Sequence, residues 1–339
     1  MAYGPMDDFP ADPTSLKTRP IPAVNDARPG TLHAAIRARR PIKVSGLIDG
    51  WTAAGWTFDS LRALGGDTPV TVLAGLPTSG GMLPGGQESY ERTMPFADFL
   101  DHAEDPDLTA PCYLGYCRPE ELIPGYGSAF DFAPLTPPGP HPTDTRLWIG
   151  SGGTCSGLHC DANDNVFTQI RGRKRVILVS ARQTHLVHPF VDNIVNSQVD
   201  PEHYDRERFP RLARARVYAT TVGPGDLLYI PRGWWHYLRS ESPSISINHW
   251  FGPMIPAHVF FGILLRLGPR YIARTAADMI RYGVLGKRYR KDFFFTPPST
   301  GECLYNLIRH GYFEPEDYHA SGPRKPAATG EEGVRSTGE

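Results

Sequence analysis

Three residues with metal-binding side chains stand out in the sequence: His159 and Asp161, which are separated by one residue, and His236 far downstream. Two imidazoles and one carboxylate form the facial triad that holds non-haem Fe(II) and leaves coordination positions open. Open positions on a redox metal imply chemistry with O2 and a chelating co-substrate. A His-x-Asp triplet alone is a weak signal, because a chain with 12 His and 36 acidic residues contains such triplets by chance.

The residues around the triplet supply the strand that its spacing needs. On a β-strand, side chains i and i+2 point to the same face, so His159 and Asp161 reach one metal only if their segment is extended. The segments that follow are typical of a hairpin, with a strand at 165–170, a turn at 171–173 and a second strand at 174–180. We therefore expect the first two ligands to lie on a sheet.

The third ligand also follows a strand. The apolar segment 227–230 lies between a Gly-Pro-Gly-Asp turn and a Pro-Arg-Gly turn, and His236 opens the next extended run. From 146 to 251 the chain is mostly short strands separated by turns, which is typical of a β-barrel or jelly roll. A histidine just past a turn at the mouth of such a barrel is well placed to complete a metal site.

Composition bounds the class of protein. A chain of 339 residues with 40% hydrophobic and 21% charged residues fits a soluble globular protein of one large domain or two modest ones. The 35 Gly and 34 Pro favour turns and short strands over long helices. The formal net charge of -1 provides no global field to attract nucleic acid or an anionic membrane, so we expect neither as a partner.

The cysteines and the apolar segments indicate the compartment. The five cysteines are an odd number and match neither a zinc pattern nor a disulfide framework. We therefore predict a reducing, cytoplasmic location, where Fe(II) also persists. No secretory signal is visible, and the longest apolar run, 259–265, is too short to span a bilayer. It predicts an amphipathic helix that packs on the rest of the protein.

The changes of pattern along the chain predict four regions. They are a loose lead-in at 1–30, a catalytic domain at 31–252 with its barrel core at about 146–252, a C-terminal helical region at 253–320 and a disordered tail at 321–339. In the front half we predict helices over 32–40, 59–64 and 93–104. The segment 187–218 is too polar for a core strand and is expected to lie over the barrel mouth, as part of the substrate wall.

Three segments in this order, 41–47, 158–180 and 222–250, resemble the JmjC/cupin-like (cupin 8) group of Fe(II)- and 2-oxoglutarate-dependent oxygenases. Within that group the pattern is most similar to the asparaginyl hydroxylase branch, typified by factor inhibiting HIF, and its bacterial relatives. The resemblance implies a mainly β double-stranded β-helix (jelly roll) with flanking helices. It also implies hydroxylation of a C–H bond of a protein side chain or small molecule, with consumption of O2 and 2-oxoglutarate and release of succinate and CO2.

The resemblance assigns roles by position. It implies that the iron ligands are His159, Asp161 and His236. It implies that 2-oxoglutarate and the surroundings of the iron are contacted by Lys174, Ser156, Tyr113, Asn165 and Asn248. Lys174 would hold the distal carboxylate, because a buried carboxylate needs a charge-assisted partner. The ordinary alternatives are a surface lysine in the basic run 171–175 for Lys174 and a turn residue for Asn165.

The C-terminal helical region resembles a part that dimerises in the asparaginyl hydroxylase branch, so a homodimer through these helices is one expectation and simple packing on the barrel is the other. The residues that would form such an interface are Phe260, Phe261, Ile263, Leu264 and Leu267. The sequence contains no zinc finger, chromatin-reading module or strong basic patch, which argues against histone demethylation.

Two other functions stay open at this point. The first is a cupin enzyme that uses its metal as a Lewis acid or as a dioxygenase without 2-oxoglutarate. Lys174, Ser156 and Tyr113 argue against it, because that chemistry needs no carboxylate anchor. The second is a barrel that binds a partner without turnover, and the complete ligand set argues against this alternative.

Overall fold

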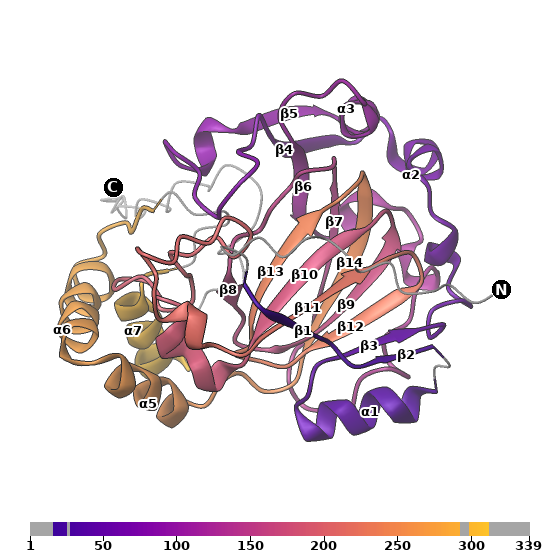
Figure 1. The fold of residues 1–339 in the computed structure, drawn as a ribbon. Coiled ribbons are helices and arrows are strands. Elements are labelled where there is room, and N and C mark those ends of the chain that lie inside the picture. The colour runs from indigo at the N-terminus through magenta and orange to yellow at the C-terminus, as the bar shows by residue number, and fades with distance from the viewer. Residues whose placement is uncertain (1–15, 26–27, 292–297, 312–339) are drawn as a thin grey trace, which may run out of the picture.

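The computed structural model describes residues 16–25, 28–291 and 298–311. In this part of the chain, two mixed β-sheets face each other, and helices lie on the outer face of the large sheet and beside the small one (Figure 1). The predicted mainly β jelly roll with C-terminal helices is thereby confirmed. The predicted tail at 321–339 lies outside the described residues, and the predicted domain boundaries stay predictions.

The strands form one small and one large sheet. The five-stranded sheet has the order β1-β11-β10-β13-β8, with the bounds Thr18–Pro20, Val217–Val222, Lys174–Val179, Trp235–Ser240 and His159–Cys160. The nine-stranded sheet has the order β2-β3-β12-β9-β14-β7-β6-β4-β5, with the bounds Ala23–Val24, Ile42–Ser45, Asp226–Ile230, Asp164–Arg171, Ser244–Phe251, Asp144–Gly150, Cys112–Cys117, Pro69–Ala74 and Glu91–Pro95. The strands predicted around the metal ligands are confirmed as β9, β10, β12 and β13.

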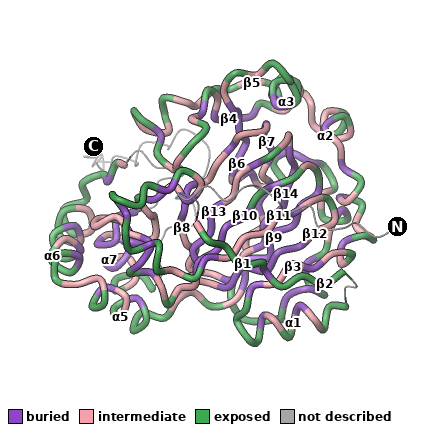
Figure 2. Tube along the Cα trace, in the orientation of Figure 1, coloured by how far each residue is buried: buried purple, intermediate pink, exposed green. Residues whose placement is uncertain are grey.

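Most residues of strand β10, in the middle of the small sheet, are buried (Figure 2). Val176 and Leu178 point between the sheets and pack in one cluster with Phe167 of β9. Ile177 and Val179 point outward and belong to a second core cluster. Because side chains alternate along a strand, an uninterrupted apolar run such as 176–179 is what a strand covered on both sides requires.

The outer cover of the small sheet is the segment 187–218, which differs from its predicted role. Five of its side chains are buried against the sheet: Val187, Val199, Tyr204, Phe209 and Leu212. Its last two residues are part of β11, which pairs with β10. The apolar residues of this segment are irregularly spaced, as is usual in a loop that covers a sheet. The sequence pattern therefore predicts no core strand here, although the segment packs against the sheet. Only Val195 and Asn196 of this segment line the central cavity.

Helices pack on the outer face of the large sheet and beside the small one. The α-helices are α1 Pro29–Ala38, α2 Phe58–Gly65, α3 Phe96–Glu104, α4 Pro119–Leu122, α5 Ala257–Leu267, α6 Pro269–Asp278 and α7 Thr300–His310. The short 3-10 helices are η1 Thr52–Gly55, η2 Gln87–Ser89, η3 Tyr126–Ser128, η4 Ala181–Leu186 and η5 Leu212–Arg214, and η6 Met279–Val284 is a π-helix. Within the described ranges, no helix is long and apolar enough to cross a membrane.

The predicted helix starts need correction. Helix α1 begins at Pro29, since proline suits the first helical turn. Helix α2 begins after Thr57, whose side chain forms a capping box with Ser60. The helix predicted over 93–104 begins only at Phe96, because 91–95 pairs with β4 as the strand β5.

The N-terminal lead-in also differs from its prediction. The strands β1 and β2 run parallel to β11 and β3, so two parts of the expected loose segment belong to the sheets. Residues 1–15 and 26–27 lie outside the described residues.

The C-terminal helices have their own core. Phe260 and Leu264 of α5 are buried with Tyr271 of α6 and with residues of α7. Two of the five side chains predicted for a dimer interface therefore pack inside the protomer, while Phe261 is 43% exposed. The amphipathic helix predicted from the apolar run 259–265 is confirmed as α5. The homodimer stays a prediction.

Gly150 of β7 faces Tyr113 of β6 so closely that a larger residue does not fit. A Cβ at this position would lie 2.4 Å from Tyr113 Cδ2 and 2.8 Å from the Cys112 carbonyl oxygen. We expect Gly150→Ala to lower the free energy of unfolding by about 1–3 kcal/mol, as overpacking does, in urea titrations. The control is Gly30→Ala in α1, where nothing lies within 4 Å and a gain of about 0.5–1 kcal/mol is expected. Equal stability of both variants would contradict this packing.

Candidate metal centre

The three predicted ligands converge on one point. Their ligand atoms all lie within 4.8 Å of one another. His159 Nε2 is 3.9 Å from Asp161 Oδ1, and His236 Nε2 is 3.5 Å from Asp161 Oδ2. In an octahedral site with bonds of about 2.1 Å, neighbouring ligand atoms are about 3 Å apart. The side chains therefore need only small rotations to bind one divalent ion.

Strand pairing produces this convergence. In the antiparallel pair of β8 and β13, His159 lies directly opposite His236, and the two ring centroids are 4.2 Å apart. Asp161 follows two residues after His159 and returns to the same face. His159 and His236 thus form one cross-strand pair of two adjacent strands, and Asp161 directly follows the first of these strands.

Backbone carbonyls hold both imidazoles in one orientation. Nδ1 of His159 lies 3.1 Å from the carbonyl oxygen of Gly157, and Nδ1 of His236 lies 3.0 Å from that of Trp234. A carbonyl oxygen only accepts hydrogen bonds, so each Nδ1 must carry the proton. The lone pair of each ring is then on Nε2, which is the atom that faces Asp161 and the other histidine.

The charges at the site are those that a cation needs. Burial, followed by the nearby His236, lowers the pKa of His159 to about 4, so this ring is neutral at physiological pH. Burial alone would raise the pKa of Asp161, but the two histidines and a hydrogen bond from Trp250 outweigh it and hold the pKa below its usual value. A neutral imidazole beside an ionised carboxylate is the protonation state that binds metal.

Lys174 is buried and lines the same cavity as the three ligands. Its side chain lies between the sheets, with the residue 3% exposed, and Nζ donates to Ser246 Oγ at 2.8 Å and to Tyr113 Oη at 3.5 Å. Within the described residues no carboxylate forms an ion pair with it, and burial lowers its pKa to about 7. The ammonium also lies 5.5 Å from the ring centroids of Tyr113 and Phe167. A buried cation without a counter-charge favours an anionic ligand.

The remaining predicted residues also line the cavity, whose volume is about 1260 Å³. Ser156 lies three residues before the first ligand, and its Oγ accepts a hydrogen bond from the Leu238 amide of β13 at 3.2 Å. Asn248 Nδ2 donates to Asn165 Oδ1 at 3.3 Å across the pair of β14 and β9. The structure thus brings together all eight residues proposed from the sequence.

Two further residues contact this group and were not proposed. Trp250 Nε1 donates to Asp161 Oδ2 at 2.8 Å, which fixes one carboxylate oxygen. Ser246 accepts from Lys174. Both lie on β14 at steps of two from Asn248, so the alternation of side chains along a strand places them on the same face and is the signal that could have found them.

One wall of the cavity is aromatic. Tyr116 and Trp250 have ring centroids 5.9 Å apart, and Trp148 lies 5.8 Å from Tyr116 and 6.3 Å from Trp250. The guanidinium of Arg146 stacks 4.5 Å from the Tyr116 centroid and is paired with Asp144 at 2.7 Å. This wall begins beside Asp161 and gives a bound molecule apolar surface next to the metal position.

The fold and this site together define a cupin-type sandwich with a candidate His-x-Asp…His metal site. Residues 30–256 match the model of the cupin-like domain, so the chain belongs to the cupin-like domain family. It is similar to Lysine-specific demethylase 8 of Xenopus tropicalis, with 29% identity over 219 residues, 63% of this chain and 48% of that protein. It is also 36% identical over 114 residues to Jumonji C domain-containing protein 5 of Drosophila melanogaster, 33% of this chain and 28% of that protein.

A third relative is HSPB1-associated protein 1 of Homo sapiens, which is 36% identical over 119 residues, 33% of this chain and 24% of that protein. The chain spans between about a quarter and about half of the length of these three relatives. The relatives place the chain among distant JmjC homologues, while the specific likeness to asparaginyl hydroxylases stays a prediction.

The hydrogen bond from Trp250 to Asp161 can be tested by substitution. Trp250→Phe keeps the ring and removes the N–H donor, so we expect it to weaken Fe(II) or Co(II) binding by about tenfold, as loss of a supporting contact to a ligand does. Trp148→Phe serves as the control, since it changes the same aromatic wall and leaves the contact to Asp161 intact. Metal titrations followed by absorption measure both, and equal affinities would mean that Trp250 does not support the ligand.

Proposed function

We propose that this protein is an Fe(II)- and 2-oxoglutarate-dependent oxygenase that hydroxylates a C–H bond of a protein side chain or a small molecule. The observation that supports this most directly is the buried Lys174 ammonium, which shares one cavity with the His159, Asp161 and His236 triad. A metal-only enzyme explains the triad but gives no reason for burying an unneutralised cation beside it.

The residues present fit iron. Nitrogen and carboxylate donors in a two-to-one ratio, with positions left open toward a cavity, suit non-haem Fe(II). His159, Asp161 and His236 would hold the ion on one side. The locked tautomers of the histidines and the contact from Trp250 restrict the motion of all three ligands before a metal arrives. The site therefore needs little rearrangement to bind it.

The residues also fit a dicarboxylate co-substrate. A carboxylate at Lys174 would replace the missing counter-charge and accept charge-assisted hydrogen bonds. The Tyr113 hydroxyl lies beside the same ammonium, and Ser156, bonded to β13 of the small sheet, lines the same cavity. An α-keto acid with a second carboxylate, such as 2-oxoglutarate, could then reach from Lys174 to the metal.

When bound, iron and 2-oxoglutarate supply the oxidation, in which the substrate C–H bond and O2 give C–OH while 2-oxoglutarate becomes succinate and CO2. The chain positions the reactants. The aromatic wall of Tyr116, Trp148 and Trp250 would orient the substrate in the cavity. One relative is Lysine-specific demethylase 8, so methyl-lysine peptides belong in the substrate screen together with unmodified peptides and small molecules.

The first test needs no known substrate. Anaerobic protein mixed with Fe(II) and 2-oxoglutarate should show the visible charge-transfer band of the metal chelate, and admission of O2 should yield succinate. Asp161→Ala should abolish both, because it removes a ligand. Absence of the band and of succinate in the wild-type protein would overturn the proposal.

Lys174→Ala separates the co-substrate from the metal. We expect it to raise the 2-oxoglutarate concentration for half-saturation by at least about tenfold while metal affinity is kept, because the lost contact is charge-assisted. Arg175→Ala is the matched control, since that basic side chain is 48% exposed and pairs with Glu202 outside the cavity. If the two variants bind 2-oxoglutarate equally well, Lys174 is not its anchor.

The lowered pKa of Lys174 predicts a pH dependence. Below about pH 7 the ammonium is charged and ready for an anion, whereas above this pH the buried amine is neutral and must take up a proton when the anion binds. The apparent affinity for 2-oxoglutarate should therefore be flat below pH 7 and fall by about tenfold per unit above it. Calorimetry in buffers of different ionisation enthalpy should show this proton uptake at pH 8, and Lys174→Met should lose it.

A further inference from the structure

The strand that carries the first metal ligand is weak by itself. Strand β8 contains only His159 and Cys160 and lies at the edge of the small sheet, where β13 is its one strand partner. A strand this short adds little pairing energy, and edge strands open more easily than central ones. The exact placement of His159 and Asp161 therefore depends on what covers the other edge.

That edge is covered by the segment 194–197. The Cys160 amide donates to the Val195 carbonyl at 2.9 Å, and the Ser197 amide donates to the Leu158 carbonyl at 2.9 Å. His159 and Asn196 form an antiparallel bridge. The segment thus acts as one more short strand next to β8.

The same segment is fastened to the start of α7 by three hydrogen bonds. The Thr300 amide donates to the Asp192 carbonyl at 2.9 Å, and the Ile194 amide donates to Thr300 Oγ1 at 2.9 Å. Asn193 Nδ2 donates to the Pro298 carbonyl at 3.2 Å. Ile194 itself is 4% exposed and packs in the core of α5, α6 and α7.

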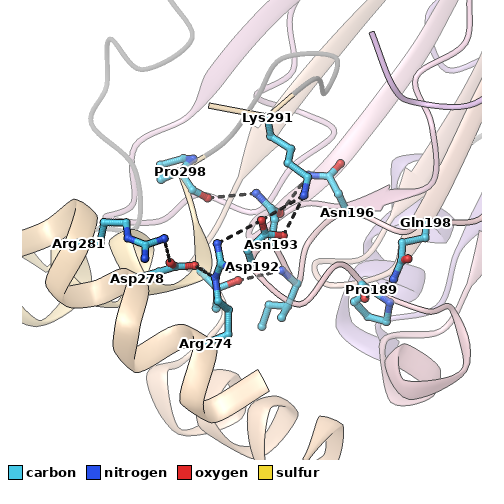
Figure 3. A network of polar contacts seen from close by, with 12 residues as sticks. Pro189, Asp192, Asn193, Asn196, Gln198, Arg274, Asp278, Arg281, Lys291 and Pro298 are labelled. Atoms are coloured by element: carbon cyan, nitrogen blue, oxygen red, sulfur yellow. Dashed lines mark hydrogen bonds and ion pairs between the residues drawn. The ribbon is translucent and has the colours of Figure 1, made fainter. Parts of the chain in front are cut away.

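Charged side chains add a second connection, shown in Figure 3. Asp192 lies 3.1 Å from Lys291 Nζ and 3.7 Å from the Arg274 guanidinium of α6. Arg274 in turn pairs with the fully buried Asp278 at 2.6 Å, and Arg281 lies 3.9 Å from Asp278. Positive and negative charges alternate along these five residues, so Asp192 is flanked by two cations. Of the five, Asp192 is the residue that belongs to the segment beside β8.

We propose that Asp192 is a positioning residue through which the C-terminal helices hold the metal-binding strand in place. Its side chain is 14% exposed, and its loss would leave the ammonium of Lys291 and the guanidinium of Arg274 with fewer acceptors in a half-buried region. The segment 192–197 would then loosen, and β8 would lose the cover on its outer edge. The proposal uses the metal-binding part of the proposed function and requires nothing of 2-oxoglutarate or substrate.

Hydrogen exchange on the metal-free protein tests this directly. In Asp192→Asn the amides of Cys160 and Ser197 should exchange about tenfold faster, because the segment that holds them opens locally. Lys291→Met should act in the same direction, and Lys291→Arg should restore slow exchange because it keeps the positive charge. Glu88→Gln is the control, since it breaks an exposed ion pair with Arg288 near the same C-terminal segment.

Co(II) titration provides the second measurement. Asp192→Asn and Lys291→Met should bind Co(II) about tenfold more weakly than the wild-type protein, at the low end of what supporting contacts to metal ligands contribute, and Lys291→Arg and Glu88→Gln should not. Faster exchange confined to the C-terminal helices, with unchanged exchange at Cys160 and unchanged Co(II) affinity, would overturn the proposal. If Asp192→Asn unfolds, the comparison of Lys291→Met with Lys291→Arg tests the proposal in its place.

The two proposals fail in different ways. A wild-type protein that does not bind Co(II) at the triad contradicts the proposed oxygenase. The exchange measurement uses metal-free protein, so it still decides whether Asp192 positions β8.

Discussion

The site depends on one strand pairing, that of β8 with β13. It places His159 directly opposite His236, and the alternation of side chains along β8 then returns Asp161 to the same face. A shift of this pairing by one residue would turn one histidine to the other side of the sheet and separate the ligands. The register is fixed from β13, because that strand also pairs along its whole length with the doubly covered β10.

Lys174, in contrast to this pairing, makes the folded protein less stable. A buried ammonium with hydroxyl partners, and with no carboxylate partner among the described residues, destabilises the free protein, and the same burial lowers its pKa. An apolar residue between the sheets would be more stable there. Residues that reduce stability are expected at functional sites. Because Lys174 lies in the cavity that the metal ligands share, it is stronger evidence for function than the fold is.

Side-chain alternation is what made the centre readable from sequence. The spacing of His159 and Asp161, the hairpin after them and the turn before His236 all follow from local rules, and the structure places these residues as expected. Alternation along 244–251 would also have supplied Trp250. The contacts of the segment 187–218 could not be read in this way, because its buried residues have neither a strand nor a helix period and its partners come from residues about 100 positions later.

An edge strand is a costly place for metal ligands, yet the chemistry favours it. Along 176–179 the inner strand β10 is covered on both faces, and Lys174 is its one residue that lines the cavity. At the edge of the sheet the metal position stays accessible from the cavity. However, β8 has only two residues and does not keep its geometry by itself. Covering that edge with a segment fastened to separate helices restores rigidity without closing the cavity. If Asp192 acts as proposed, the geometry of the candidate site depends on residues beyond the sandwich, in the helices after 256 that lie outside the matched family domain.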